Sequence, residues 1–207
     1  MSIMTLYRRL KAGISLKLVR ISILSLGSIF GGVLGIFIFD FVILKIGEDS
    51  LKLIQSLILL VLMIVIYVYT LNKDRFPDYD VKNYIVLGLL GVVLGFVASF
   101  LGIGGGPINV MILMLVMALN AKEAAIHSIF IIFFAQLSKI IFIGFTGVLF
   151  ELDVSVVLIM ITGGLMGGYL GSRISVDVSN KVVMKIFQGT VLFLIGLNLY
   201  NSIAVLV

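Results

Sequence analysis

Long apolar stretches, separated by short polar segments, dominate the chain. They cover residues 21–44, 51–71, 84–101, 107–119, 124–147, 153–174 and 182–207. Most of them reach the roughly 20 residues that an α-helix needs to cross a bilayer. The pattern therefore predicts an all-α fold, a polytopic membrane helical bundle of about six to seven spans.

One stretch breaks this pattern in the middle of the chain. Residues 102–109 read Gly-Ile-Gly-Gly-Gly-Pro-Ile-Asn, between two apolar runs. Four glycines in five residues disfavour a helix, because each costs about 1 kcal/mol relative to alanine. Pro107 then suits the first turn of a new helix. Irregular backbone in hydrocarbon is tolerated only beside other protein or a water-filled cavity. We therefore expect a broken helix beside a cavity.

The start of the second helix is the candidate binding site. Free N–H groups and the positive end of the helix dipole favour an anionic guest there. The alternative is that the glycines only let two helices pack closely, and that Asn109 is a structural residue at a helix start. The candidate substrate-binding residues of this stretch are Gly102, Gly104, Gly105, Gly106, Pro107, Ile108 and Asn109.

The apolar stretch 124–147 adds three polar candidates: His127, Ser128 and Lys139. An ionisable group inside a span indicates function by default. The alternatives are that Lys139 snorkels to the interface and that His127 caps or packs the helix. Gln55 and Gln188 are expected to join helices by hydrogen bonds.

Composition excludes several classes of protein. The chain is 61% hydrophobic, carries a net charge of +5 and has no cysteine. Its basic residues lie beside apolar spans, as topology determinants do, so no nucleic-acid partner is expected. No triad, metal-ligand cluster, paired carboxylate or mid-membrane carboxylate is evident. We therefore expect no enzyme, no metal site and no cofactor, and a small anionic solute fits better than a cation.

The distribution of charge predicts the topology in the cell membrane. Residues 1–20 are basic without an acid, so this arm is expected in the cytoplasm. The preferred topology has 107–119 as a crossing, with the turn at 147–152 outside and the basic turn at 172–185 inside. At thirteen residues, 107–119 could instead be re-entrant, which would reverse the sides of everything after it.

An internal repeat divides the chain. Four glycines recur 136 positions later: Gly27, Gly31, Gly32 and Gly35 recur as Gly163, Gly167, Gly168 and Gly171. Lys52, Gln55 and Tyr67 also recur, at an offset of 133. We expect two inverted repeats, as is common in transporters. The domains are a truncated first repeat (1–71), a polar linker (72–83) and a second repeat (84–207).

The first repeat has no counterpart of the glycine break. The sequence therefore predicts either a shortened chain with a misplaced start or a homo- or hetero-oligomer in which another polypeptide supplies the first half-site. In the second case, the chain would be a non-transporting subunit of a heteromeric complex.

The chain resembles the sulfite exporter TauE/SafE family. The resemblance is carried by GIGGGP at 102–107, His127-Ser128, and GGLMGGYLGSRIS at 163–175. It implies a multi-pass transporter or exporter of small anions such as sulfite, sulfonates or related organic anions. The chain departs from the family where Met111 replaces a proline, where His127-Ser128 replaces a Thr-Ser pair, and where the first glycine motif is absent.

Overall fold

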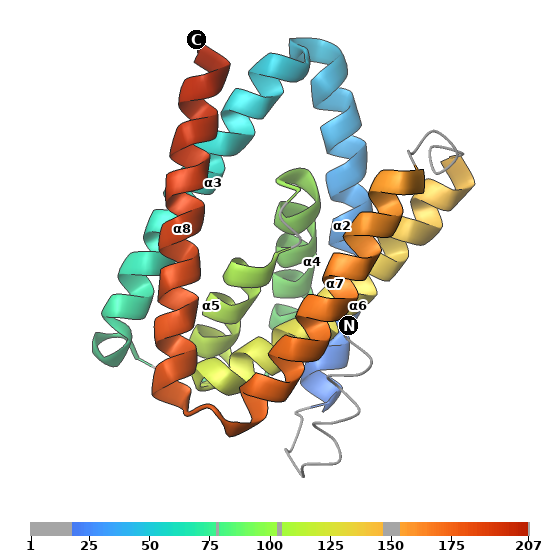
Figure 1. Ribbon diagram of the computed structural model, residues 1–207. Helices are drawn as coiled ribbons and strands as arrows, with labels where there is room; N and C mark the ends of the chain where they lie inside the picture. Colours follow the sequence, from blue (N-terminus) through green and yellow to red (C-terminus); the bar gives the residue numbers. More distant parts are fainter. Residues whose placement is uncertain (1–17, 78, 103–104, 147–153, 207) are drawn as a thin grey trace.

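The computed structural model describes residues 18–77, 79–102, 105–146 and 154–206. Its long helices coincide with the predicted apolar stretches, and their bounds differ by a few residues (Figure 1). In chain order the elements are α2 (Leu18–Ile46), α3 (Glu48–Leu71), the short 3-10 helix η1 (Lys73–Arg75), α4 (Tyr84–Phe100), α5 (Gly106–Val116), α6 (Ala121–Thr146), α7 (Val154–Asp177) and α8 (Asn180–Leu206).

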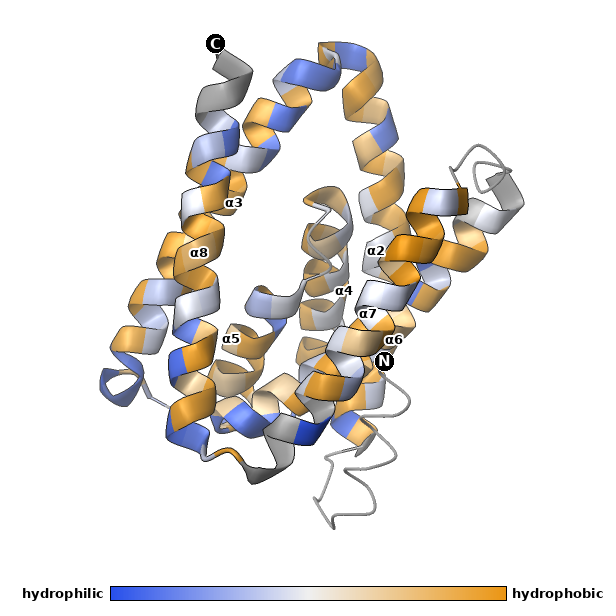
Figure 2. Cartoon of the chain, in the orientation of Figure 1, coloured by the Kyte–Doolittle hydropathy of each residue, from blue (hydrophilic) through white to orange (hydrophobic). Residues whose placement is uncertain are grey.

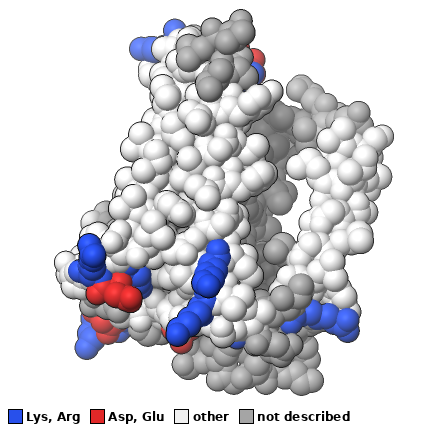
Figure 3. Space-filling model, turned by 60° about the vertical axis from the view of Figure 1, so that its left-hand side comes forward, with Lys and Arg blue, Asp and Glu red and all other residues white. Residues whose placement is uncertain are grey.

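The surface of the helices is suited to lipid. Five of them, α2, α3, α6, α7 and α8, are long and apolar enough to cross a membrane. Large apolar side chains such as Phe30 and Ile159 are exposed on these helices, and apolar residues cover most of each long helix (Figure 2). Charged side chains gather toward the two ends of the molecule (Figure 3). The predicted all-α, polytopic membrane bundle is confirmed.

Glycines bring α2 and α4 into backbone contact. A Cβ added to Gly31 would lie 1.9 Å from the carbonyl oxygen of Val92, and one added to Gly95 would lie 2.1 Å from that of Ser28. Small residues allow this close approach, which is a main source of helix association in lipid. The glycine stripe of α2 therefore fixes the position of α4.

The helices α3 and α8 run antiparallel. Ser202 Oγ lies 3.0 Å from Ser56 Oγ, and Gln188 Nε2 donates to Thr70 O at 3.1 Å. From Ser56 to Thr70 the chain advances 14 residues along α3, while the contacting residues on α8 go back 14 residues, from Ser202 to Gln188. The expectation that Gln55 and Gln188 join helices is confirmed, because Gln55 Nε2 also donates to the backbone, at Phe100 O of α4.

The connections α3–α4, α5–α6 and α7–α8 meet at one end of the bundle, here called the linker end (Figure 1). Arg20 at the start of α2 pairs with Asp80 of the linker at 2.5 Å. Lys122 at the start of α6 donates to Val178 O, just after α7, at 2.9 Å. The basic turn after α7 therefore lies at the same end as the linker, as the preferred topology predicts.

Helices α4 and α5 form a hairpin that enters and leaves at the linker end. Tyr79 N and Val81 N, just before α4, donate to Leu115 O and Val116 O at the end of α5. With 11 residues, α5 is about 16 Å long, too short for a span. The prediction that 107–119 crosses the membrane is wrong. The later helices nevertheless keep the sides of the membrane that the preferred topology gives them, because the chain enters α4 and leaves α5 at the same end, the linker end.

The two glycine stripes have opposite directions and different surroundings. Helix α2 starts at the linker end and α7 finishes there, so the predicted inversion of the glycine helices is confirmed. A Cβ added to Gly163, Gly167 or Gly171 of α7, however, would meet no atom within 4 Å in the described part of the chain. The division at 1–71, 72–83 and 84–207 stays a prediction, and residues 1–17 of the basic arm lie outside the described residues.

Candidate functional site

The predicted helix break is present. Helix α4 ends at Phe100, and α5 begins at Gly106 with Pro107 in its first turn. Gly102 and Gly105 have φ angles of +72° and +74°, in the left-handed region that glycine adopts without a Cβ penalty. Gly105 caps the start of α5. Gly104 lies outside the described residues.

The break lies inside the span of α2 and not at its end. A Cβ on Gly35 of α2 would lie 2.8 Å from Cβ of Ser99 and 3.2 Å from N of Phe100, which places Gly35 beside the last turn of α4. From Gly35, α2 continues to Ile46, about 16 Å further along its axis. The chain therefore leaves the helical conformation at membrane depth, as the sequence predicts.

Asn109 is a buried polar residue in the first turn after the break. Its side chain is 2% exposed, and its Oδ1 has no hydrogen-bond partner among the described residues. A Cβ added to Gly105 would lie 3.2 Å from Nδ2 and 3.4 Å from Oδ1 of Asn109, so the amide lies against the cap of α5. A buried polar atom without a partner costs about 1–3 kcal/mol. The site thus calls for a water or a guest.

Replacing Asn109 with leucine is expected to leave the thermal stability unchanged within about 1 kcal/mol, because leucine has a similar volume and removes an unsatisfied buried group. If the amide contacts the guest, the same variant should bind it about tenfold more weakly, the usual loss of one hydrogen bond. Melting in detergent and anion binding measure the two effects. A variant that melts far below the wild type would show that Asn109 is structural.

Lys139 is half-buried on α6 at the depth of the break. Its neighbour Ser138 faces Gly32 of α2, which in turn faces Ser99 in the last turn of α4: a Cβ on Gly32 would lie 3.9 Å and 3.3 Å from the two Oγ atoms. Within the described ranges, no acidic group forms an ion pair with Lys139. A lysine at this depth without an acidic partner among the described residues is a candidate for contact with an anion.

His127 and Ser128 lie lower, toward the linker end. Both are buried, at 1% and 4% exposure, and both bond within α6: His127 Nδ1 to Glu123 O at 2.7 Å and Ser128 Oγ to Ala125 O at 2.8 Å. His127 is about 9 Å from the start of α6 along its axis, whereas Lys139 is about 27 Å from it. These bonds suit the packing alternative, and contact with a guest stays a prediction.

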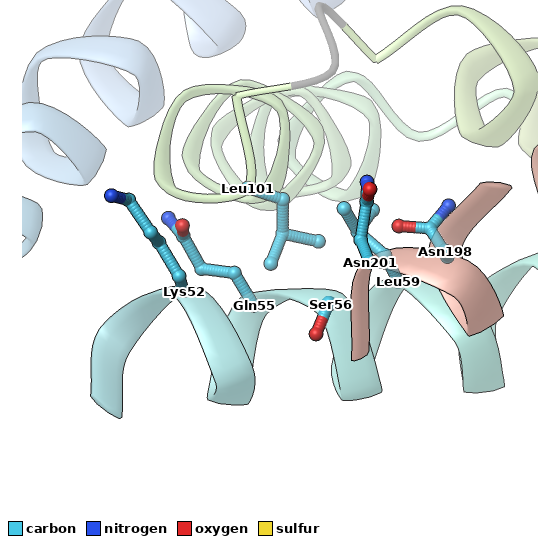
Figure 4. Close-up of a pocket in the computed structure, with 7 residues that line it drawn as sticks. All are labelled: Lys52, Gln55, Ser56, Leu59, Leu101, Asn198 and Asn201. Carbon is cyan, nitrogen blue, oxygen red and sulfur yellow. The ribbon is translucent and has the colours of Figure 1, made fainter. Parts of the chain in front are cut away.

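A cavity of about 360 Å³, lined by both polar and apolar side chains, adjoins the break on the side of α3 and α8. Figure 4 shows Leu101, the cap of α4, between Gln55 of α3 and Asn201 of α8. The cavity is lined by Lys52, Gln55, Ser56, Leu59, Leu101, Asn198 and Asn201. Three amides and one lysine therefore lie next to the unwound backbone, which is how small-solute sites are built. The hydroxyl of Ser56 points away from Leu101 (Figure 4) and is bonded to Leu53 O and Ser202 Oγ.

Sequence reasoning assigned none of this cavity to the site. It interpreted Gln55 only as a helix tether and did not consider Ser56, Asn198 or Asn201. A signal existed in α8, where Asn198, Asn201 and Ser202 lie three and four residues apart and share one face of an otherwise apolar helix. That face could be assigned to a cavity only once α3 and the end of α4 were known to lie opposite.

Comparison with known proteins identifies the relatives of the chain. It is 29% identical over 131 residues to the "Probable membrane transporter protein YunE" of Bacillus subtilis (strain 168), covering 63% of this chain and 46% of that protein. It is 32% identical over 107 residues to the "Probable membrane transporter protein MamO" of Magnetospirillum gryphiswaldense, covering 49% of this chain and 17% of that protein. The matches thus span less than half the length of either relative. No solved structure matches significantly.

The family itself is evident from a longer match. The description "Sulfite exporter TauE/SafE" applies to residues 1–199, which include the glycine break, the hairpin and both glycine stripes. The broken helix at membrane depth agrees with a transporter, since discontinuous helices form the binding sites of many secondary transporters. The chain belongs to the sulfite exporter TauE/SafE family of membrane transporters.

Proposed function

We propose that this chain carries a small anion, such as sulfite, a sulfonate or a related organic anion, across the cell membrane. The observation that carries the proposal is the break between α4 and α5 at membrane depth. The first N–H groups of α5 have no acceptor within the helix, and an anion at a helix start is stabilised by them and by the dipole. The guest would lie against Gly105, Gly106 and Ile108, with Asn109 beside it.

The surrounding charge supports an anionic guest. Lys139 lies at the depth of the break, and Lys52 lines the adjoining cavity. The acidic residues of the described cavity walls lie away from the break: Asp74 and Glu123 are at the linker end. Glu48 pairs with Lys52 at 2.8 Å, so Lys139 is the cation near the break that has no acidic partner among the described residues. Its positive charge raises the local concentration of anions and opposes cations.

The orientation follows from the same charges. Basic residues are concentrated at the linker end; they are Arg20, Lys73, Arg75, Lys82, Lys122, Lys181 and Lys185. The far end has Lys45 and Lys52 beside Asp40, Glu48 and Asp49. By the positive-inside rule, the linker end and the basic arm before it face the cytoplasm. Orientation-specific labelling of the chain in cells tests this assignment.

Lys139→Met is expected to reduce anion flux into reconstituted vesicles by about tenfold or more, because it removes a charge-assisted contact worth about 1.5–3 kcal/mol. The matched control is Lys45→Met, which removes an equal charge from an exposed position in the last turn of α2. Sulfite and methanesulfonate flux are measured for both. Equal flux in the two variants would contradict a role for Lys139.

A second candidate function is that of a membrane subunit that does not transport alone. The glycine stripe of α7 favours it, because the equivalent stripe of α2 packs against α4, while a Cβ added to Gly163, Gly167 or Gly171 of α7 would meet no atom within 4 Å among the described residues. The occupant would be a glycine-bearing apolar helix like α4. Purification as a complex heavier than one 22.6 kDa chain, with flux in the complex only, supports this candidate, and flux by the isolated chain contradicts it.

A further inference from the structure

The structure has a second polar cavity, of about 850 Å³, at the linker end. It lies between η1, the end of α5 and the starts of α6 and α8. Its lining includes three lysines, Lys73, Lys181 and Lys185, with Asp74, Glu123 and amide side chains among them. Its lysines outnumber its carboxylates, so it too is electropositive. The cavity beside the break and this one thus lie on two sides of the α4–α5 hairpin.

Repeat-related residues line the two cavities. Lys52 and Gln55, in the first turns of α3, line the cavity beside the break. Their equivalents at an offset of 133, Lys185 and Gln188, lie in the first turns of α8 and line the cavity at the linker end. The match in sequence is therefore also a match in position.

Each glutamine holds the wall of its cavity in the same way. Gln55 donates to Phe100 O at the end of α4, and Gln188 donates to Thr70 O near the end of α3. In both cases a side-chain amide satisfies a carbonyl in the last turn of another helix, where no intrahelical donor remains. In both cases the lysine one turn earlier on the helix is left to line the cavity.

The pairing of α3 with α8 relates the two cavities by an approximate two-fold rotation. The contacts Ser56 to Ser202 and Thr70 to Gln188 fix the two helices in antiparallel register. Shifting the numbering by the repeat offset of 133 matches α3 with α8. The start of one helix is therefore equivalent to the start of the other. The two starts lie at opposite ends of the pair, so the rotation turns one cavity mouth into the other.

The hairpin separates the two cavities. Leu101, at the end of α4, lines the cavity beside the break, and Met114, Ala118 and Leu119, at the end of α5, line the other. Helix α5 begins five residues after Leu101 of the first cavity, and its end lines the second cavity. An anion that passes between the cavities has to pass this short helix.

We infer that the two cavities are the opposite mouths of one anion path, and that Lys52 and Lys185 are equivalent anion-binding residues, one at each mouth. The guest is a small oxyanion or sulfonate, which accepts hydrogen bonds from an ammonium group and from amide N–H groups. Glu48 pairs with Lys52 at 2.8 Å, and both side chains are exposed, so this pair is weak and gives way to a bound anion. This inference rests on the proposed function.

The absence of cysteine from the chain allows a side-specific test. Asn201→Cys places a thiol in the cavity beside the break and Met184→Cys places one in the cavity at the linker end. In vesicles of known orientation, a membrane-impermeant thiol reagent should modify each variant from one side only, and the two sides should differ. Methanesulfonate should slow both reactions, and chloride at equal ionic strength should not.

Lysine variants then assign the protection. Lys52→Met should weaken protection by methanesulfonate about tenfold for the thiol at 201 and leave that at 184 unchanged, and Lys185→Met should do the reverse. Lys45→Met serves as the control for charge alone. Modification of both thiols from one side, or protection that neither lysine variant alters, would overturn the inference. Protection without flux would support both binding sites and refute the transport proposal. Flux without protection would support the transport proposal and refute the two binding sites.

Discussion

Gly31→Ala is expected to destabilise the protein more than any other single methyl group added to α2. The new Cβ would lie 1.9 Å from Val92 O and 2.7 Å from its carbonyl carbon, which are backbone atoms that cannot rotate away. The two helices have to separate, at a cost of about 3 kcal/mol or more. For a chain of this size, that corresponds to a fall in melting temperature of roughly 6–12 °C, measured by thermal unfolding in detergent.

The repeat supplies the matched control. Gly167 is the equivalent of Gly31 at the offset of 136, and a Cβ added there meets no atom within 4 Å in the part of α7 and its neighbours that the structure describes. Gly167→Ala should therefore keep or raise the melting temperature, since alanine favours the helix by up to about 1 kcal/mol. Equal destabilisation by both variants would contradict the packing of α2 on α4.

Gly105→Ala is expected to abolish most of the anion flux. Gly105 has a φ angle of +74°, where a residue with a Cβ costs roughly 1–2 kcal/mol, and the Cβ would also lie 2.9 Å from Ala98 Cβ. The cap of α5 has to move, and with it the N–H groups that hold the guest. A loss of about tenfold or more is expected, measured as sulfite flux into reconstituted vesicles.

The next residue separates this effect from a general effect of alanine. Gly106 has no positive φ angle, and a Cβ added to it meets no atom within 4 Å in the described structure. Gly106→Ala keeps the backbone N–H that the guest would contact and adds a methyl group in open space, so it should keep its flux within about twofold of the wild type. If both variants transport equally well, the geometry of the cap does not matter to the guest.

Hydropathy predicts the positions of the helices, because lipid favours apolar side chains along the whole length of a membrane span. The predicted stretch 84–101 compares with α4 at Tyr84–Phe100, and 124–147 compares with α6 at Ala121–Thr146. The break is equally local: glycines at 102 and 105 adopt positive φ angles, and Pro107 occupies the first turn of α5. The helices and the break depend on residues that are adjacent in the chain, so they can be predicted from the sequence.

Features that depend on which helices touch could not be predicted in this way. The hairpin of α4 and α5 is held by Tyr79 and Val81 donating to the last carbonyls of α5, and a linker of mixed polarity gives no sign of such bonds. The glycine stripes of α2 and α7 are alike in sequence, yet Gly31 packs against α4, while a Cβ added to its equivalent Gly167 would meet no atom within 4 Å in the described structure. The cavity at Leu101 depends on three helices that meet from distant parts of the chain.

The central claim is that the break faces water and solute inside the membrane. The most direct measurement compares Leu101→Cys, beside the break, with Val93→Cys, 56% exposed on the outer face of the same helix. A membrane-impermeant thiol reagent should modify position 101 in intact membranes, and methanesulfonate should slow that reaction. Position 93 should stay unreactive, because hydrocarbon suppresses the thiolate. Equal and slow reaction at both positions would show that the break is dry and would contradict the claim.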